Sequence, residues 1–161
     1  MNLRDLAGSG PVLVDGAWGT ELQKRGMQAG ECPDSWNLSR PEFVAEVARA
    51  YVDAGSRIIL TNTFRAKIAL SREAANGRAL VFASLGPTGK VLSAGEISDG
   101  EVLAAFEEQA AALAEGGADA LVIKTMSDVS ESALALAAAH KTGLPVIVSF
   151  TFDTGKKKVA P

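Results

Sequence analysis

The residues of this chain best placed to do chemistry are polar or charged and come directly after short apolar runs. Functional side chains gather there in parallel α/β folds, because the carboxyl ends of the strands share one edge of the sheet. Asp15 follows three aliphatic residues, where an unpaired carboxylate would be costly, so it is expected to meet a donor or a cationic ligand. The candidate substrate-binding residues are Asp15, Gly16, Asn62, Thr63 and Lys124.

Two of these positions leave a second interpretation open. Asp15 could instead be a structural cap on the loop that follows, although Gly16 and Gly19 would let a ligand approach the backbone. Lys124 could act as a nucleophile in a different small-molecule enzyme, since strand-end lysines can form Schiff bases. The sequence shows no acid–base partner for that lysine, and no catalytic residue is assigned from it.

Other segments that suggest chemistry are better explained as structure. Residues 86–91 read Gly-Pro-Thr-Gly-Lys-Val, which lacks the spacing and the Ser/Thr ending of a P-loop. Residues 8–10 precede a strand and lack the third glycine of a dinucleotide fingerprint. Both are predicted to be turns. His140 precedes Lys141 in the last turn of a predicted helix, which favours a surface position facing the helix dipole.

Composition and charge limit the classes of protein that fit. A chain of 161 residues with 47% hydrophobic and 22% charged residues is typical of one globular domain. The net charge of −3 gives no indication of nucleic-acid binding. The only basic run, residues 156–158, is expected to be a solvated tail. No apolar run is long enough for a membrane span and no export signal is evident, so a cytoplasmic protein is expected.

One cysteine, Cys32, is present. It excludes an intramolecular disulfide and a cysteine-rich zinc site made by this chain alone, and it agrees with a reducing compartment. No metal ligand is therefore assigned.

The elements that must position these residues alternate along the chain. Five apolar runs predict buried parallel strands, because strands covered on both faces are continuously apolar; they are residues 12–14, 57–60, 79–83, 120–123 and 146–150. Helical periodicity predicts a helix over 41–54, capped by Ser39 with Glu42 and stopped by Gly55. Similar starts are expected at Ser98 with Glu101 and near Asp128 with Glu131.

Repeated strand–helix–strand units predict right-handed parallel crossovers, in an open doubly wound sheet or in a barrel. The second crossover is short and predicts one helix over about 66–75, stopped by Asn76 and Gly77. Because an eight-unit barrel needs about 250 residues, the predicted fold is an incomplete (β/α)8 TIM-type barrel with about five strands. Residues 1–161 are expected to form this single partial domain.

The strand-end motifs also resemble a known family. The segment Asp15-Gly16-Ala17-Trp18-Gly19-Thr20, residues 61–64 (Thr-Asn-Thr-Phe), 86–89 (Gly-Pro-Thr-Gly) and 125–128 (Thr-Met-Ser-Asp) occur in the order typical of homocysteine S-methyltransferases. The resemblance spans nearly the whole chain. It implies a barrel that binds homocysteine and transfers a methyl group to its thiol to give methionine, with zinc holding the thiolate and three protein cysteines completing the site.

The resemblance also implies departures from the family. Asp15 matches the acid that helps to hold the homocysteine amine, whereas Lys124 stands where the partner acid is expected and would repel an ammonium group. Cys32 matches no zinc position. The family has a longer region between Phe64 and the third strand, which implies an internal deletion here, together with a truncation before the zinc cysteines.

The sequence therefore predicts a zinc-dependent methyltransferase by resemblance only, inactive as an isolated chain, without zinc of its own and with a homocysteine-like small molecule as its partner. No nucleic acid or membrane partner is expected. The alternative is a non-catalytic binding or assembly module that self-associates through open strand edges.

Overall fold

The computed structural model describes residues 6, 8, 10–62 and 65–152. Its strands are β1 (Ile58–Asn62), β2 (Leu80–Leu85), β3 (Ala120–Met126) and β4 (Val146–Phe150). Its helices are α2 (Trp18–Lys24), α3 (Trp36–Ser39), α4 (Pro41–Asp53), α5 (Arg65–Ala75), α6 (Asp99–Glu115) and α7 (Val129–His140). Two short 3-10 helices cover Pro33–Ser35 and Leu92–Ala94.

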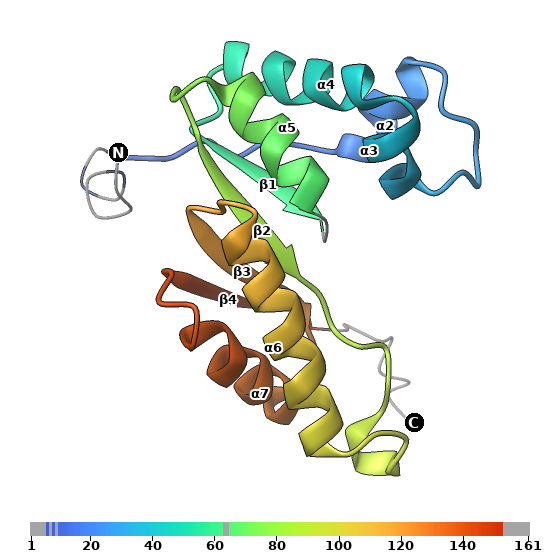
Figure 1. Ribbon diagram of the computed structural model, residues 1–161, viewed down its shortest axis with the longest axis vertical. Helices are drawn as coiled ribbons and strands as arrows, with labels where there is room; N and C mark the ends of the chain where they lie inside the picture. The colour runs from blue at the N-terminus through green and yellow to red at the C-terminus, as the bar shows by residue number, and fades with distance from the viewer. Residues whose placement is uncertain (1–5, 7, 9, 63–64, 153–161) are drawn as a thin grey trace, which may run out of the picture.

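The sheet is parallel throughout, and its strands lie side by side in chain order, β1-β2-β3-β4. The outward face of β2 and β3 packs against helices, with Ile68 of α5, Phe106 of α6 and Ala138 of α7 in one buried cluster. Helices α4 to α7 lie on the same side of the sheet in Figure 1. A doubly wound sheet reverses its strand order and carries helices on both faces, so this arrangement is a segment of a (β/α)8 barrel.

The other face of the sheet forms a separate apolar layer. Ile58, Leu80, Phe82 and Val122 alternate with the outward residues of their strands and pack beneath Leu6. Because both faces of β2 are covered, all six of its residues are buried, as its continuous apolar pattern predicts.

The first predicted strand is shorter than expected. Its part of the ladder is one isolated parallel bridge between Val14 and Ile58, although the Leu13 carbonyl accepts hydrogen bonds from Arg57 and Ile58 and the Asp15 N–H donates to Ile58. The next donor along β1, the N–H of Leu60, bonds to the Asp15 side chain at 3.0 Å. The carboxylate thus takes the place of a backbone acceptor and ends the ladder.

The predicted helix starts differ in outcome. Ser98 and Glu101 form the complete capping box of α6. Asp128 caps α7 through the N–H groups of Ser130 and Glu131, but the Glu131 side chain bonds to another loop. The cap predicted at Ser39 is wrong, because the Ser39 hydroxyl donates to the Ser35 carbonyl within the preceding turn and α4 has no side-chain cap.

The short second crossover is the single helix α5, as predicted. Asn76 at φ 45° and Gly77 at φ 73° end it in the left-handed region. The Arg72 guanidinium ties the last turns of α5 to the loop before β3, through the Gly117 carbonyl at 2.7 Å and the Asp119 carboxylate at 3.0 Å.

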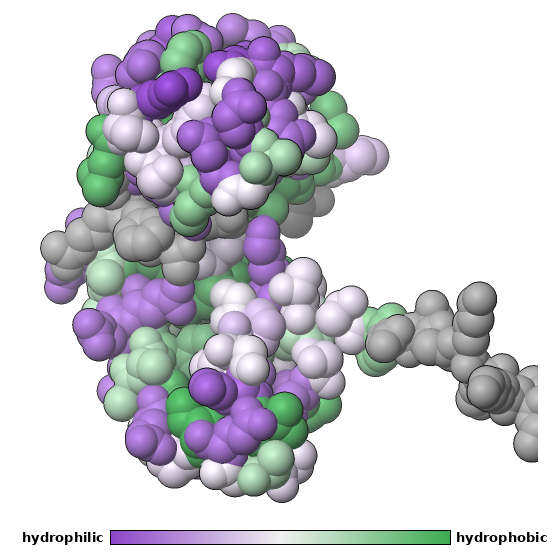
Figure 2. Space-filling view, turned by 90° about the vertical axis from the view of Figure 1, so that its right-hand side faces the viewer, coloured by the Kyte–Doolittle hydropathy of each residue, from purple (hydrophilic) through white to green (hydrophobic). Residues whose placement is uncertain are grey.

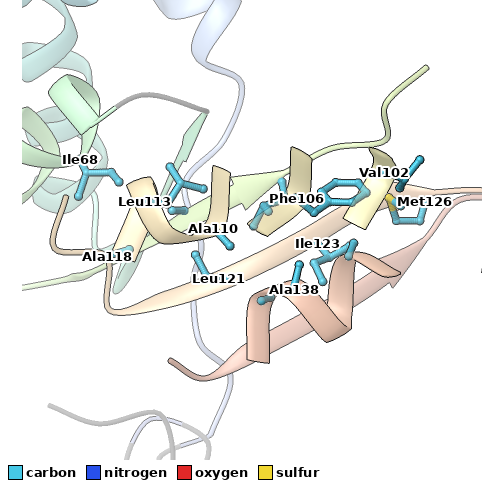
Figure 3. Packing of buried hydrophobic residues seen from close by; sticks show 14 of the residues in the cluster. Ile68, Val102, Phe106, Ala110, Leu113, Ala118, Leu121, Ile123, Met126 and Ala138 are labelled. Carbon is cyan, nitrogen blue, oxygen red and sulfur yellow. The ribbon is translucent and has the colours of Figure 1, made fainter. Parts of the chain in front are cut away.

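The main core lies between α6, α7 and the sheet. Figure 3 shows Leu113, Ala110, Phe106 and Val102 following one stripe of α6 toward the strands. The surface turned toward the viewer in Figure 2 is a mosaic, and hydrophilic residues dominate its upper, helical part. Among the residues described, no helix is long and apolar enough to span a membrane.

Candidate functional site

Asp15 directly follows Val14, which bridges to β1, and is only partly exposed. Its Oδ2 accepts hydrogen bonds from Trp18 Nε1 at 2.6 Å and from the Leu60 N–H at 3.0 Å. Burial raises the pKa of this carboxyl above its usual range, while these two hydrogen bonds and the nearby charges of Lys67 and Lys124 oppose the rise. The structure therefore shows Asp15 as a structural cap of the loop that follows, and its role in binding a ligand stays a prediction.

Lys67, in the first turn of α5, is the residue of this site that sequence reasoning missed. It is 5% exposed, and its Nζ lies 4.1 Å from the centroid of the Trp18 ring. Burial lowers its pKa to about 8, while Asp34 and Asp15 act to raise it and Lys124 acts to lower it further. We call Asp15, Trp18 and Lys67 the strand-end cluster.

Gly16 follows Asp15 in a crowded position. A Cβ at this residue would lie 3.0 Å from the Tyr51 hydroxyl oxygen, and that hydroxyl donates to the Ala17 carbonyl at 3.2 Å. The glycine thus lets Tyr51 of α4 approach the loop that carries Asp15. This explains Gly16 by packing, in addition to the ligand access expected from the sequence.

Lys124 lies near the end of β3, partly exposed, next to an unusual backbone conformation. Thr125 has φ 60°, a left-handed conformation that is costly for a β-branched residue. Its hydroxyl donates to the Lys124 carbonyl at 2.6 Å, and the β3–β4 register shifts between Ile123 and Met126. Strain of this kind is found where the surrounding structure fixes a side chain direction.

A pocket of about 320 Å³ opens beside Lys124, between the ends of β2 and β3 and the helix α6. Its lining includes Ser84 of β2, Phe106 and Gln109 of α6, and the loop residues Gly86 and Thr88. The Ser84 side chain is buried, and within the described part of the chain its Oγ has no hydrogen-bond partner.

The remaining sequence candidates are placed as follows. Asn62 ends β1, but its side chain lies outside the described part, as does the whole of Thr63. Cys32 is exposed in the loop before the Pro33–Ser35 turn. His140 is the exposed last residue of α7. Among the described residues, no three His, Cys, Asp or Glu side chains lie together in a way that could hold a metal.

Comparison with known proteins identifies the family to which this chain belongs. The family model described as "Homocysteine S-methyltransferase" matches residues 12–76 and 65–160. The two matched segments overlap on α5 and the turn after it. The shared stretch is the short second crossover, where the sequence resemblance indicates that this chain lacks residues that the family has.

Relatives of known sequence give the same picture. Methionine synthase from Mycobacterium leprae is 27% identical over 186 aligned positions, covering 89% of this chain and 15% of the relative. The enzyme of the same name from Mycobacterium tuberculosis is 26% identical, covering 95% of this chain and 16% of the relative. The first alignment is longer than the 161 residues of this chain, so the relative has residues there that this chain lacks.

Among solved structures, the apo form of the homocysteine methyltransferase MmuM from Escherichia coli superposes with a TM-score of 0.78 at 26% identity, covering 94% of this chain and 64% of MmuM. Its oxidized form gives a TM-score of 0.71. The chain thus spans less than two thirds of MmuM and less than a fifth of the methionine synthases.

Proposed function

Because this chain belongs to the homocysteine S-methyltransferase family, we propose that its strand ends bind a homocysteine-like amino acid and that Asp15 receives the ammonium group. The observation that carries this proposal is the position of Asp15, a partly buried acid at the carboxyl end of a parallel barrel segment whose family model covers residues 12–160. Gly16 lets Tyr51 of α4 pack against the loop that carries Asp15.

The family resemblance implies a zinc ion that holds the substrate thiolate, but the donor groups of this chain do not fit that metal. Structural and catalytic zinc sites use three or four thiolate, imidazole or carboxylate ligands. The chain has one cysteine and one histidine; Cys32 lies in an exposed loop and His140 at the end of α7. We therefore propose binding without methyl transfer by these residues alone.

Calorimetric titration with L-homocysteine under reducing conditions tests the binding. Asp15→Asn keeps the size of the side chain and removes its charge, and we expect affinity to fall about ten-fold or more, the range for a charge-assisted hydrogen bond. Glu73→Gln, at an exposed position on α5, is the matched control. Equal affinity of Asp15→Asn and the unaltered chain would contradict the assignment of Asp15.

Elemental analysis tests the zinc statement. The folded chain, purified with zinc and homocysteine present, is expected to carry far less than one zinc per chain and to make no methionine from homocysteine and a methyl donor. About one zinc per folded chain would overturn it, and would show that Cys32 or chain association builds a thiolate site.

The non-catalytic assembly module is a second candidate because apolar residues are exposed on both edges of the sheet. Leu13 and Val14 are 60% and 45% exposed beside β1, and Ile147 of β4 is 41% exposed. A second copy of this chain is the proposed occupant, since parallel edges of the same sheet can pair with each other. Light scattering should then show a dimer that Ile147→Lys disrupts; a well-folded monomer at high concentration would exclude it.

A further inference from the structure

The pocket between β2, β3 and α6 has two polar groups that the fold leaves unused. The Ser84 side chain is 4% exposed, and among the residues described its Oγ meets no donor or acceptor. Lys124 lines the same pocket, and within the described part of the chain its ammonium group makes no hydrogen bond or ion pair. A buried hydroxyl without a partner destabilises the fold, so its retention calls for an explanation.

The pocket is held open by its own loop contacts. The Glu131 carboxylate, which is 3% exposed, accepts hydrogen bonds from the Thr88 N–H at 2.6 Å and the Thr88 hydroxyl at 2.7 Å. These two bonds fix the loop after β2 against α7. The left-handed Thr125 fixes the backbone just after Lys124 on the other side.

The charges around the pocket distinguish the two lysines. The ammonium group of Lys67 already has favourable interactions, because it lies 4.1 Å from the centroid of the Trp18 ring and is attracted to Asp34 and Asp15. Of the groups that shift the pKa of Asp15, Lys124 has the smallest effect. The charges of Lys124 and Lys67 repel each other. Glu131, the buried acid in the first turn of α7, already accepts two hydrogen bonds from Thr88. The Lys124 charge is therefore the one available to a ligand.

We propose that this pocket binds the carboxylate of a small molecule, with Lys124 supplying the charge and Ser84 a hydroxyl donor. This inference deepens the proposed function, on which it depends for the identity of the site, because it assigns the ligand's acidic group to Lys124 while Asp15 receives its ammonium group. The two lysines then make a singly charged anion a better ligand than a singly charged cation.

Two thiols test this directly, since each keeps the chain and the thiol of homocysteine. The anion γ-mercaptobutyrate lacks the ammonium group, and the cation γ-mercaptopropylamine lacks the carboxylate. Calorimetry of the full chain should show tighter binding of the anion. Lys124→Gln should weaken the anion about ten-fold, as for the loss of one charge-assisted hydrogen bond, and Lys124→Glu should reverse the order of the two ligands.

The controls separate this inference from the proposed function. Lys141→Gln, at the exposed position just after the carboxyl end of α7, should change neither affinity. If homocysteine binds but the cation binds as tightly as the anion, the role of Lys124 is overturned and the proposed function stands. If the anion binds and homocysteine does not, the proposed function fails and the carboxylate pocket stands. Absence of binding by all three compounds overturns both.

Ser84→Ala gives a second readout that a structural role would not produce. Removing an unpartnered buried hydroxyl should leave the free energy of unfolding unchanged or raise it, while weakening the anion several-fold. A destabilised variant with unchanged anion affinity would show that Ser84 serves the fold and not the ligand.

Discussion

Lys67 shows how a single residue can escape a sequence pattern. It lies in the first turn of α5, where a lysine is normally solvated, and the periodicity of that helix marks apolar residues only. Its burial depends on Trp18, the first residue of α2, which lies almost fifty positions earlier in the chain and covers the ammonium group. Only the three-dimensional structure brings the two together. Asp15, by contrast, was predictable because its signal is local: an acid directly after an apolar run.

The lowered pKa of Lys67 predicts a pH dependence of stability. Its pKa falls from 10.5 to about 8 on folding, chiefly through burial, so between these two values the unfolded chain binds more protons than the folded chain. The free energy of unfolding should therefore rise with pH in this window, with a contribution of up to about 1.4 kcal/mol per pH unit. Urea unfolding at a series of pH values measures it.

Lys67→Met should remove this contribution, because the thioether has no proton to lose. Lys90→Met, at an exposed position in the loop after β2, is the control and should keep the slope of the unaltered chain. If the Lys67→Met and Lys90→Met variants show equal slopes, the lysine is not buried as described.

Gly16 and Tyr51 form a pair whose coupling can be measured. Gly16→Ala places a methyl group 3.0 Å from the Tyr51 hydroxyl oxygen, and overpacking of this kind typically costs about 1 to 3 kcal/mol. Tyr51→Phe removes that oxygen, so the double variant should be less destabilised than the sum of the single variants. Strict additivity in urea unfolding would mean that the loop moves away freely.

At the scale of helices and strands, local signals predicted most elements and failed where a distant group intervened. The cap at Asp128 was predictable, but Glu131 turns to Thr88 instead of completing the box. The strand at 12–14 was predicted from its apolar residues, but the Asp15 carboxylate ends its ladder at Leu60. In both cases a side chain bonds to a group that is distant in sequence. The neighbouring residues alone therefore do not predict the partner.

The complete capping box predicts a specific loss of helix stability. Ser98→Ala removes the hydroxyl that accepts from the Glu101 N–H at the start of α6, and the free energy of unfolding should fall by about 0.5 to 2 kcal/mol. Urea unfolding of this variant and of Ser93→Ala, an exposed serine in the preceding 3-10 helix, makes the comparison. Equal stability of the two variants would show that α6 starts without the box.

At the scale of the whole molecule, the sequence predicted parallel crossovers but did not choose between a doubly wound sheet and a barrel. The choice depends on the spatial order of strands and on which face the helices cover. Neither is encoded in the apolar period, because Val81 and Phe82 look alike in sequence although one faces the helices and the other the inner layer. The family resemblance predicted a barrel, and the strand order β1-β2-β3-β4 confirms that prediction.

The single domain expected over residues 1–161 predicts one cooperative unfolding transition, and the sheet predicts how protection varies within it. β2 is flanked by β1 and β3 and is buried along its whole length, so its amides should exchange most slowly with deuterium. β4 pairs only with β3 among the strands described and is mostly exposed or partly exposed, so its amides should exchange at least about ten times faster.

Repeating the exchange experiment at high protein concentration checks the assembly alternative. Pairing of two copies through the β4 edge would slow exchange in β4 and leave β2 unchanged. Two separate unfolding transitions, or protection highest in β4 at low concentration, would contradict a single domain with an open edge.

The agreement between spatial and chain order of the strands also bears on synthesis. Each strand pairs with the one translated just before it, so a nascent chain leaving the ribosome can add one helix and one strand at a time to a sheet already begun, and no strand waits for a distant partner. Pairing of consecutive strands keeps the sequence separation of contacts smaller than in a sheet whose strand order reverses, and smaller separation favours faster folding. Each newly added strand stays open only until the next strand pairs with it, which shortens the time during which that edge of the growing polypeptide can pair with another chain.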